Sequence, residues 1–319
     1  MHTAKLSRRS ALARAGLLAG AAVLGRNIEF RATAADPPRS KESPFRFSLN
    51  AATIRGQKLG LAKEIDIAVQ AGYDGIEPWV DSIEAFVQAG GSLADLKKKL
   101  ADSGLAVEGA ISFPEWIVDD DARRAKGFER AKREMDLVAQ LGGKRFAAPP
   151  AGATGLPQLD LVKAAERYRA LLEAGDQLGI VPQLELWGFS KNLGKLGECV
   201  CVAMETGHPR ACVLADVFHL YKGASDIHGM RLLSSSAVQV LHMNDYPAEP
   251  PRDKIDDSYR IFPGDGTAPL ADILAALHQT GGQKVLSLEL FNRKYWSEDP
   301  LSVAKTGLAK MKAVAAKVA

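Results

Sequence analysis

The chain has 319 residues, and its 46% hydrophobic and 25% charged residues match an ordinary globular protein. This balance excludes a disordered or collagen-like chain, and three cysteines are too few for a disulfide scaffold. The formal net charge is +3, but the positive excess comes from the first 34 residues. Residues 35–319 hold 35 basic and 37 acidic side chains, which argues against nucleic acid as a partner.

Residues 1–34 have the pattern of an export signal of the twin-arginine type. Arg8-Arg9 precedes a weakly apolar run from Ala11 to Gly25, and Ala32-Thr33-Ala34 matches a small-residue cleavage site. We therefore predict a periplasmic or otherwise exported protein with a linker over 35–44 and no membrane contact after the signal is removed. Cleavage of the signal and its retention as an anchor both stay open.

The rest of the chain alternates between short β-branched runs and amphipathic helical stretches, about eight times. Strands are expected at 45–52, 75–80, 106–112, 144–149, 181–187, 211–218, 238–244 and 285–291. Helices are expected at 58–71, 92–103, 121–141, 158–178, 195–206, 229–235, 270–280 and 300–317. This alternation predicts an α/β fold, a single-domain (β/α)₈ TIM barrel over 45–319. The turn after the first strand has no G-x-G-x-x-G, which disfavours a doubly wound sheet.

Active sites of such barrels lie at the carboxyl ends of the strands. The last four expected strands end in Glu185, in Asp216 with His219 three residues on, in His242 and in Glu289. An acid flanked by leucines is costly to bury without a positive partner, and a divalent cation can serve several acids together. Carboxylates with one imidazole favour Mn²⁺ or Mg²⁺ over a structural zinc. The alternative is that each acid pairs with its own Lys or Arg.

This ordered set, together with the turn Pro263-Gly264-Asp265-Gly266, resembles the xylose isomerase-like TIM-barrel superfamily. That sugar phosphate isomerase/epimerase group includes D-tagatose 3-epimerase, hydroxypyruvate isomerase and inosose dehydratase. The resemblance implies one divalent metal, Mn²⁺ first and Mg²⁺, Co²⁺ or Zn²⁺ as alternatives, bound by Glu185, Asp216, His242 and Glu289. It also implies that Glu185 and Glu289 act as the acid/base pair.

The implied activity is that of a metal-dependent sugar isomerase or epimerase, which transfers a proton next to a carbonyl through a metal-stabilised enediolate. His219 is expected to bind the developing oxyanion, and orienting Asp216 is its alternative role. Lys191 and Ala248 stand where the keto-sugar 3-epimerases carry Glu and Arg, which disfavours simple ketohexose epimerisation. A lyase or dehydratase acting on a keto-polyol or 3-keto-glycoside by β-elimination is the alternative enzyme, and a non-catalytic sugar-binding barrel is a third reading.

Aromatic and basic residues near the expected strand ends suggest how a small carbohydrate or polyol is held. The predicted substrate contacts are Glu77, Trp79, Trp116, Trp187, Trp296 and Arg252, besides His219. Arg252 lies with Lys254 and Arg260 in a 24-residue segment, 246–269, which is long enough to form a lid. The alternatives are that the tryptophans pack under loops and that the basic residues are solvated. A homo-oligomer stays open.

Overall fold

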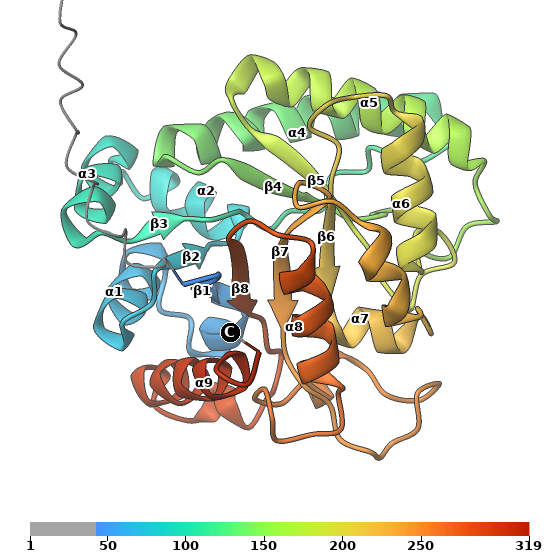
Figure 1. Cartoon of the computed structure of the whole chain (residues 1–319). Helices are drawn as coiled ribbons and strands as arrows, with labels where there is room; N and C mark the ends of the chain where they lie inside the picture. The colour runs from blue at the N-terminus through green and yellow to red at the C-terminus, as the bar shows by residue number, and fades with distance from the viewer. Residues whose placement is uncertain (1–42, 319) are drawn as a thin grey trace, which may run out of the picture. The chain divides into compact units, whose positions relative to one another are not determined.

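A computed structural model describes residues 43–318, so the predicted signal lies outside the described residues. Its eight parallel strands follow the order β3-β2-β1-β8-β7-β6-β5-β4. The strands are β1 (Phe45–Asn50), β2 (Gly75–Glu77), β3 (Ala106–Val107), β4 (Arg145–Ala148), β5 (Val181–Glu185), β6 (Val213–Asp216), β7 (Val238–Met243) and β8 (Lys284–Leu288). Backbone hydrogen bonds from Ala110 to Arg145 and from Ala147 to Ala110 join the two outer edges. The sheet therefore curls into the predicted barrel (Figure 1).

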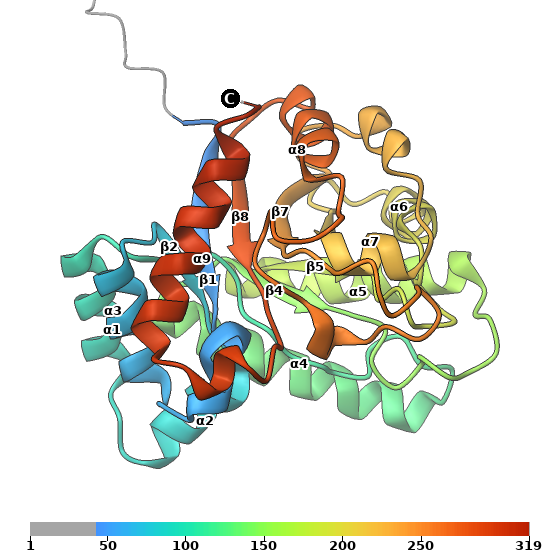
Figure 2. The same ribbon diagram turned by 90° about the horizontal axis from the view of Figure 1, so that it is seen from below.

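Helices lie outside the strands and connect each one to the next. The α-helices are α1 (Leu61–Ala71), α2 (Val80–Gln88), α3 (Leu93–Ser103), α4 (Asp121–Leu141), α5 (Leu161–Leu178), α6 (Leu196–Glu205), α7 (Val217–Lys222), α8 (Leu270–Gln279) and α9 (Pro300–Ala315). Short 3₁₀ helices are η1 (Ala51–Gln57), η2 (Ile227–Leu232), η3 (Asp257–Tyr259) and η4 (Tyr295–Ser297). The last helix, α9, packs beside α1 and across β1 and β8 (Figure 2). Among the described residues, no helix has the length and apolar character that a membrane span requires.

Local sequence signals explain where several of these helices begin and end. The side chains of Ser92, Asp120 and Asp160 each accept a hydrogen bond from a backbone N–H in the first turn of the helix that follows. At the other end, Gly104 and Gly142 have φ angles of 70° and 94°, in the left-handed region that ends a helix. The expected helices 92–103 and 121–141 are therefore confirmed almost to the residue.

All eight expected strands end earlier than predicted, and at two of them side chains of the site explain why. The strand predicted over 211–218 stops at Asp216, because this carboxylate accepts from His219 N and caps α7. The strand predicted over 106–112 keeps regular pairing only at Ala106–Val107. Beyond it, a Cβ at Gly109 would lie 2.6 Å from Glu77 Oε1, so the backbone leaves room for that carboxylate. The helix α2 was not predicted.

The barrel interior is layered, which fixes the height of the polar residues at its carboxyl end. Near the start of β1 and β4, Arg46 and Arg145 both pair with Glu108, at 2.9 Å and 3.2 Å. Above these two ion pairs lies a buried apolar layer, which consists of Ile111, Ala147, Leu214, Val240 and Val285. The acids at the strand ends therefore stand on an apolar floor, where their charge must be compensated locally.

One buried carboxyl group lies outside this interior. Glu64 of α1 is 3% exposed, and its Oε2 has no hydrogen-bond partner among the described residues. Burial raises the pKa of Glu64 from 4.5 to about 7, against the opposing effect of Arg55 and with a smaller contribution from Asp81. The folded protein thus holds this proton more tightly than the unfolded chain does.

The raised pKa of Glu64 predicts a pH-dependent stability. The contribution of protonated Glu64 to the free energy of unfolding is full below pH 4.5 and is lost as the pH rises through about 7. Above that pH the folded protein holds a buried charge, which unfolding exposes to water. Glu64→Gln should match the wild type in urea unfolding at pH 4 and exceed it by about 2–3 kcal/mol at pH 8. The exposed Glu166→Gln serves as control. An equal difference at both pH values would contradict the account.

Candidate active site

Four acids and one histidine meet at the carboxyl end of the barrel, and we call them the acid cluster. The cluster consists of Glu77 from β2, Glu185 from β5, Asp216 from β6, His242 from β7 and Glu289 directly after β8, each 3% exposed or less. His242 Nδ1 lies 3.5 Å from Glu185, 3.7 Å from Asp216 and 3.2 Å from Glu289. The structure therefore brings together the four residues predicted as metal ligands.

The ring of His242 is held by Glu77 from the opposite side. His242 Nε2 donates to Glu77 Oε2 at 3.1 Å, while Nδ1 is buried without a hydrogen-bond partner among the described residues. Asn50 Nδ2 also donates to Glu77, at 3.4 Å, and to Glu289, at 3.1 Å. A carboxylate that holds one ring nitrogen leaves the other free to bind a metal. Glu77 was predicted as a substrate contact, and here its carboxylate holds the ring of His242.

Burial and the neighbouring charges shift the pKa values of His242 and Glu185. Burial lowers the pKa of His242, but Glu289 and Glu77 outweigh burial and raise it well above its ordinary value. Burial raises the pKa of Glu185 to about 7, with His242 opposing and with Glu289 and Asp216 adding to the rise. A cation inside the cluster would relieve both effects.

Arg260 reaches the acid cluster, although the sequence placed it only among the basic residues of segment 246–269. Its NH1 donates to Asp216 Oδ2 at 2.6 Å and to Glu289 Oε2 at 2.8 Å, and its side chain is 1% exposed. Burial works against the charge of Asp216, but Arg260 and then His219 outweigh it and lower the pKa of Asp216 to about 2. The guanidinium is also held by Asp257, whose Oδ1 accepts from NH2 at 2.6 Å.

The backbone explains why this arginine reaches the cluster. Asp245 and Ile261 exchange backbone hydrogen bonds of 3.0 Å and 2.9 Å, which ties the residue after Arg260 to the end of β7. The segment 246–269 lies beyond the arrowheads of β7 and β8 in Figure 1. An apolar Ile261-Phe262 pair within a polar loop was the sequence signal for this return.

Arg252, by contrast, does not reach the acid cluster. Its guanidinium lies 6.0 Å from the ring of Tyr221, and it lines a hollow on the outer wall with Tyr246 and Pro269. The residue is exposed, and its backbone carbonyl accepts from Lys222 Nζ. The predicted substrate contact of Arg252 does not fit this position, because the loop turns Arg260 inward instead.

The four tryptophans divide into two pairs. Trp79 and Trp187 stand at the mouth of the barrel, each half-buried. Trp116 is fully buried, donates to Pro149 O and packs against Tyr168, so it serves the core. Trp296 donates to Ala52 O and covers η1. The predicted substrate contacts of Trp116 and Trp296 therefore do not fit their positions.

His219 lies beside the cluster and is held through its backbone N–H and through its ring. Its backbone N–H donates to Asp216 Oδ1 at 2.8 Å, and its ring Nε2 accepts from Arg260 NH2 at 3.1 Å. Burial lowers the pKa of His219, with Asp216 opposing and Arg260 reinforcing the effect. The ring is therefore neutral with its proton on Nδ1, which is buried and has no partner among the described residues.

The residues fit a divalent cation. Glu185, His242 and Glu289 each offer a ligand atom, and these atoms lie within 4.8 Å of one another. His242 Nδ1 and Glu185 Oε2 are both buried without a hydrogen-bond partner in the described part of the chain, a costly arrangement that a metal would relieve. Asp216 lies beside this group, and its Oδ2 accepts from Arg260 and from Asn244.

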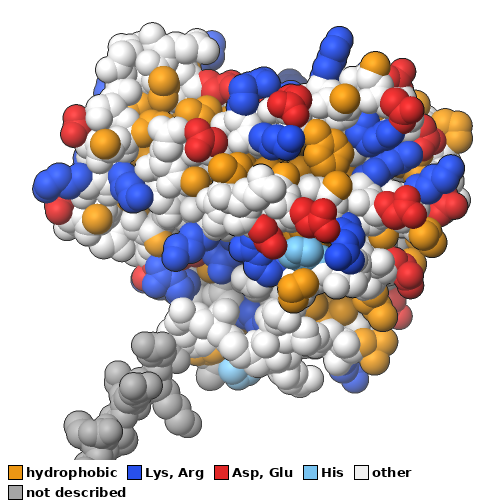
Figure 3. All heavy atoms as spheres, turned by 90° about the horizontal axis from the view of Figure 1, so that it is seen from above, with side chains coloured by type: hydrophobic (Ala, Val, Ile, Leu, Met, Phe, Trp, Pro, Cys, Tyr) orange, Lys and Arg blue, Asp and Glu red, His pale blue; other side chains and the backbone are white. Residues whose placement is uncertain are grey.

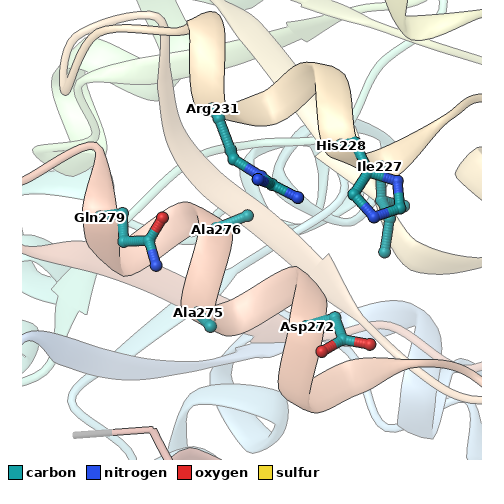
Figure 4. A pocket seen from close by; sticks show the side chains of 7 residues that line it. All are labelled: Ile227, His228, Arg231, Asp272, Ala275, Ala276 and Gln279. Carbon is teal, nitrogen blue, oxygen red and sulfur yellow. The ribbon is translucent and has the colours of Figure 1, made fainter.

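Hollows on the outer wall lie apart from the cluster. Because η2 replaces a full helix between α6 and α8, a hollow of about 180 Å³ opens beside it, lined by His228, Arg231 and Asp272 among others (Figure 4). It shares no residue with the acid cluster.

On the face drawn in Figure 3, positive and negative side chains are interspersed, so this part of the described surface carries no broad patch of one charge.

Comparisons with known proteins agree with the fold. The family model described as xylose isomerase-like TIM barrel matches residues 65–314. The chain is 25% identical to a 3-dehydroshikimate dehydratase of Pseudomonas putida over 79% of this chain and 39% of that protein. It is 24% identical to an inosose isomerase of Bacillus velezensis, over 81% of this chain and 92% of that protein. The crystal structure of the IolI protein with a bound zinc atom superposes with a TM-score of 0.79 and 20% identity, covering 86% of this chain and 99% of that one.

The chain therefore belongs to the xylose isomerase-like TIM barrel family. The relatives that it matches are enzymes, some of them isomerases and others dehydratases. The chain spans about two-fifths of the length of the dehydratases. The family predicted from the strand-end residues is confirmed.

The position of Arg260 predicts a coupling between stability and metal. Arg260→Met removes the counter-charge of Asp216 and Glu289, so the metal-free variant should lose about 3–5 kcal/mol of stability. Added Mn²⁺ should then raise the melting temperature of the variant more than that of the wild type, because a bound cation replaces the lost charge.

Differential scanning calorimetry with EDTA and with Mn²⁺ measures both effects. Arg169→Met is the control, since Arg169 forms a half-exposed pair with Glu173 and should matter by less than about 1 kcal/mol. Equal Mn²⁺ shifts in Arg260→Met and wild type would show that arginine and metal do not serve the same charges.

Proposed function

We propose that this protein is a divalent-metal-dependent isomerase or epimerase of a carbohydrate or polyol that carries a carbonyl group. One observation carries the proposal: within residues 43–318, His242 Nδ1 and Glu185 Oε2 are buried without hydrogen-bond partners where Asp216 and Glu289 also converge. An arrangement with unpaired ligand atoms is expensive in a structural cluster and expected in a binding site.

The side chains divide the chemistry among them. The metal, when bound, polarises the carbonyl and makes the neighbouring C–H more acidic. Glu185 has two buried carboxylate oxygens, so when one of them binds the metal the other is left to take that proton. Glu289, fixed by donors from Asn50 and Arg260, is the second carboxylate. In an epimerisation it first takes a proton from water and then gives it to the opposite face of the carbon, while Glu185 releases its proton to water.

His219 has the role of a donor in this proposal. Since Arg260 donates to its Nε2, the proton on Nδ1 is free to hydrogen-bond a substrate oxygen that gains charge. The neutral imidazole is maintained by burial, which lowers its pKa. Both observations support a role on the substrate side, while its backbone N–H is engaged by Asp216.

A lyase is the second candidate, and the 3-dehydroshikimate dehydratases favour it. Removal of the same proton by Glu185 leads to elimination when the substrate carries a leaving group on the β-carbon. The C–H bond then breaks, a C=C bond forms, and the leaving group departs with a proton. Isomerase and lyase thus share their first step and differ in the substrate.

The enzyme and its class can be tested together. Wild-type protein loaded with Mn²⁺ is mixed in D₂O with inosose and with 3-dehydroshikimate, and both reactions are followed by NMR. An isomerase or epimerase incorporates deuterium at carbon, and the substrate loses no water. A lyase releases water and forms a new alkene signal. Neither reaction on any carbonyl polyol, with metal bound, would contradict the proposed function.

The proton-transfer role of Glu185 has its own test. Glu185→Gln keeps the shape and an oxygen ligand but removes the base, so turnover should fall by about 10²–10⁴ while Mn²⁺ still binds. His242→Ala should lose metal and turnover together. Metal analysis and steady-state rates separate the two, with Glu166→Gln as an exposed control. Full activity in Glu185→Gln would remove this residue from the chemistry.

We further propose that Mn²⁺ is the resident metal and that the protein is exported by the twin-arginine route. The first rests on the oxygen-rich ligand set, although the similar IolI structure holds zinc. The second rests on Arg8-Arg9 and the apolar run after them. Changing Arg8-Arg9 to Lys-Lys should retain the protein in the cytoplasm by cell fractionation, and continued export would point to another route.

A further inference from the structure

Aromatic side chains form a closed ring around the mouth of the acid cluster. We call this ring the aromatic collar; it consists of Trp79, Phe113, Trp187, Phe189, His219 and Phe291. Centroid distances between neighbouring rings are 5.2 Å for Trp79–Phe113, 5.6 Å for Phe113–Trp187, 5.3 Å for Trp187–Phe189, 5.6 Å for Phe189–His219 and 6.1 Å for Trp79–Phe291. Arg260 closes the ring, because its guanidinium lies 5.2 Å from Phe291 and 3.1 Å from His219 Nε2.

Hydrogen bonds connect the collar directly to the cluster. Trp79 Nε1 donates to Asn50 Oδ1 at 3.2 Å, and Asn50 in turn donates to Glu77 and Glu289. A ligand whose reacting carbon reaches the acids therefore has its remaining atoms between these rings.

The rings are only partly covered by protein. Phe189 is 49% exposed, and four other members of the collar are half-buried. Partly exposed aromatic surface gathered beside a few convergent polar groups is typical of a ligand-binding site. The stacked pair of Trp187 and Phe189, with planes 28° apart, offers the broadest flat face.

The collar offers few free hydrogen-bond donors to a polar group attached to the reacting sugar. Among residues 43–318, the indole N–H groups of Trp79, Trp116 and Trp296 have protein acceptors, which leaves that of Trp187. Arg55 lies 4.1 Å from the Trp79 ring but is bidentate on Asp81, and Arg260 is engaged by three acids. A phosphate or a second sugar would find little here to replace its water.

We propose that the substrate is a glycoside-like molecule in which the carbonyl-bearing ring enters the acid cluster and a planar aromatic substituent lies in the collar. This inference names the substrate class and so rests on the proposed function. The aromatic group packs against Phe189 and Trp187, and the indole N–H of Trp187 reaches the linking oxygen.

Binding of unreactive probes tests the collar without turnover. Phenyl β-D-glucopyranoside and methyl β-D-glucopyranoside share the sugar and differ only in the aromatic group. Isothermal titration of Mn²⁺-loaded protein should give a dissociation constant about tenfold lower for the phenyl glucoside, which corresponds to one favourable aromatic contact. Phe189→Ala should reduce that preference to less than about threefold, because Phe189 supplies an open ring face.

Two further variants make the test specific. Met204→Ala removes a large exposed apolar side chain, 73% exposed on α6, and should keep the tenfold preference. Trp187→Phe keeps a ring but removes the N–H, so it should weaken both glucosides alike. Equal binding of the two probes by the wild type, or an unchanged preference in Phe189→Ala, would overturn the proposal. Phenyl preference without any turnover of keto-polyols would instead count against the proposed function alone.

Discussion

The repulsion among four buried carboxylates is the constraint on which the site depends. Each acid of the cluster has lost nearly all contact with water, and each stands above an apolar floor. Neighbouring negative charges in such surroundings are stable only when positive charge lies among them. In the described structure, His242 and Arg260 supply that charge directly. The geometry of the strand ends, the loop after β7 and the start of α7 all serve this compensation.

The compensation also explains how distant segments are coupled. Arg260 belongs to the long segment between β7 and α8, yet its guanidinium touches residues from β6, α7 and the end of β8. Because Ile261 is paired with Asp245, the arginine cannot leave without disturbing the end of β7. A cation at His242 Nδ1 would share Asp216 and Glu289 with this arginine. Metal content and the arrangement of this loop are thus physically linked.

The sequence was sufficient for the fold and for three of the four acids, because both follow from local rules. Alternating apolar runs predicted the strands, and capping residues such as Asp120 and Gly142 marked helix ends. The position of an acid at the end of a strand determines where it points, so Glu185, His242 and Glu289 could be predicted to converge. Asp216 was also predicted there, although its capping of α7 was not.

The remaining features depend on tertiary contacts, which local sequence patterns do not predict. Choosing Arg260 over Arg252 requires knowing that Ile261 returns to Asp245, which is a pairing between segments 16 residues apart. Trp116 and Trp187 have similar positions after their strands, but Trp116 is fully buried against Tyr168 whereas Trp187 is half-buried. The aromatic collar likewise emerges only when four loops and the helix α7 are brought together.

The most direct test of the central claim is the location of a metal ion. Crystals of the protein loaded with Mn²⁺ would be measured at the manganese absorption edge, and an anomalous difference map calculated. The account predicts one strong peak bounded by His242 Nδ1 and by carboxylate oxygens of Glu185 and Glu289. A map without a peak there, with Arg260 still bridging Asp216 and Glu289, would show that the acids are compensated by protein alone and would contradict the account.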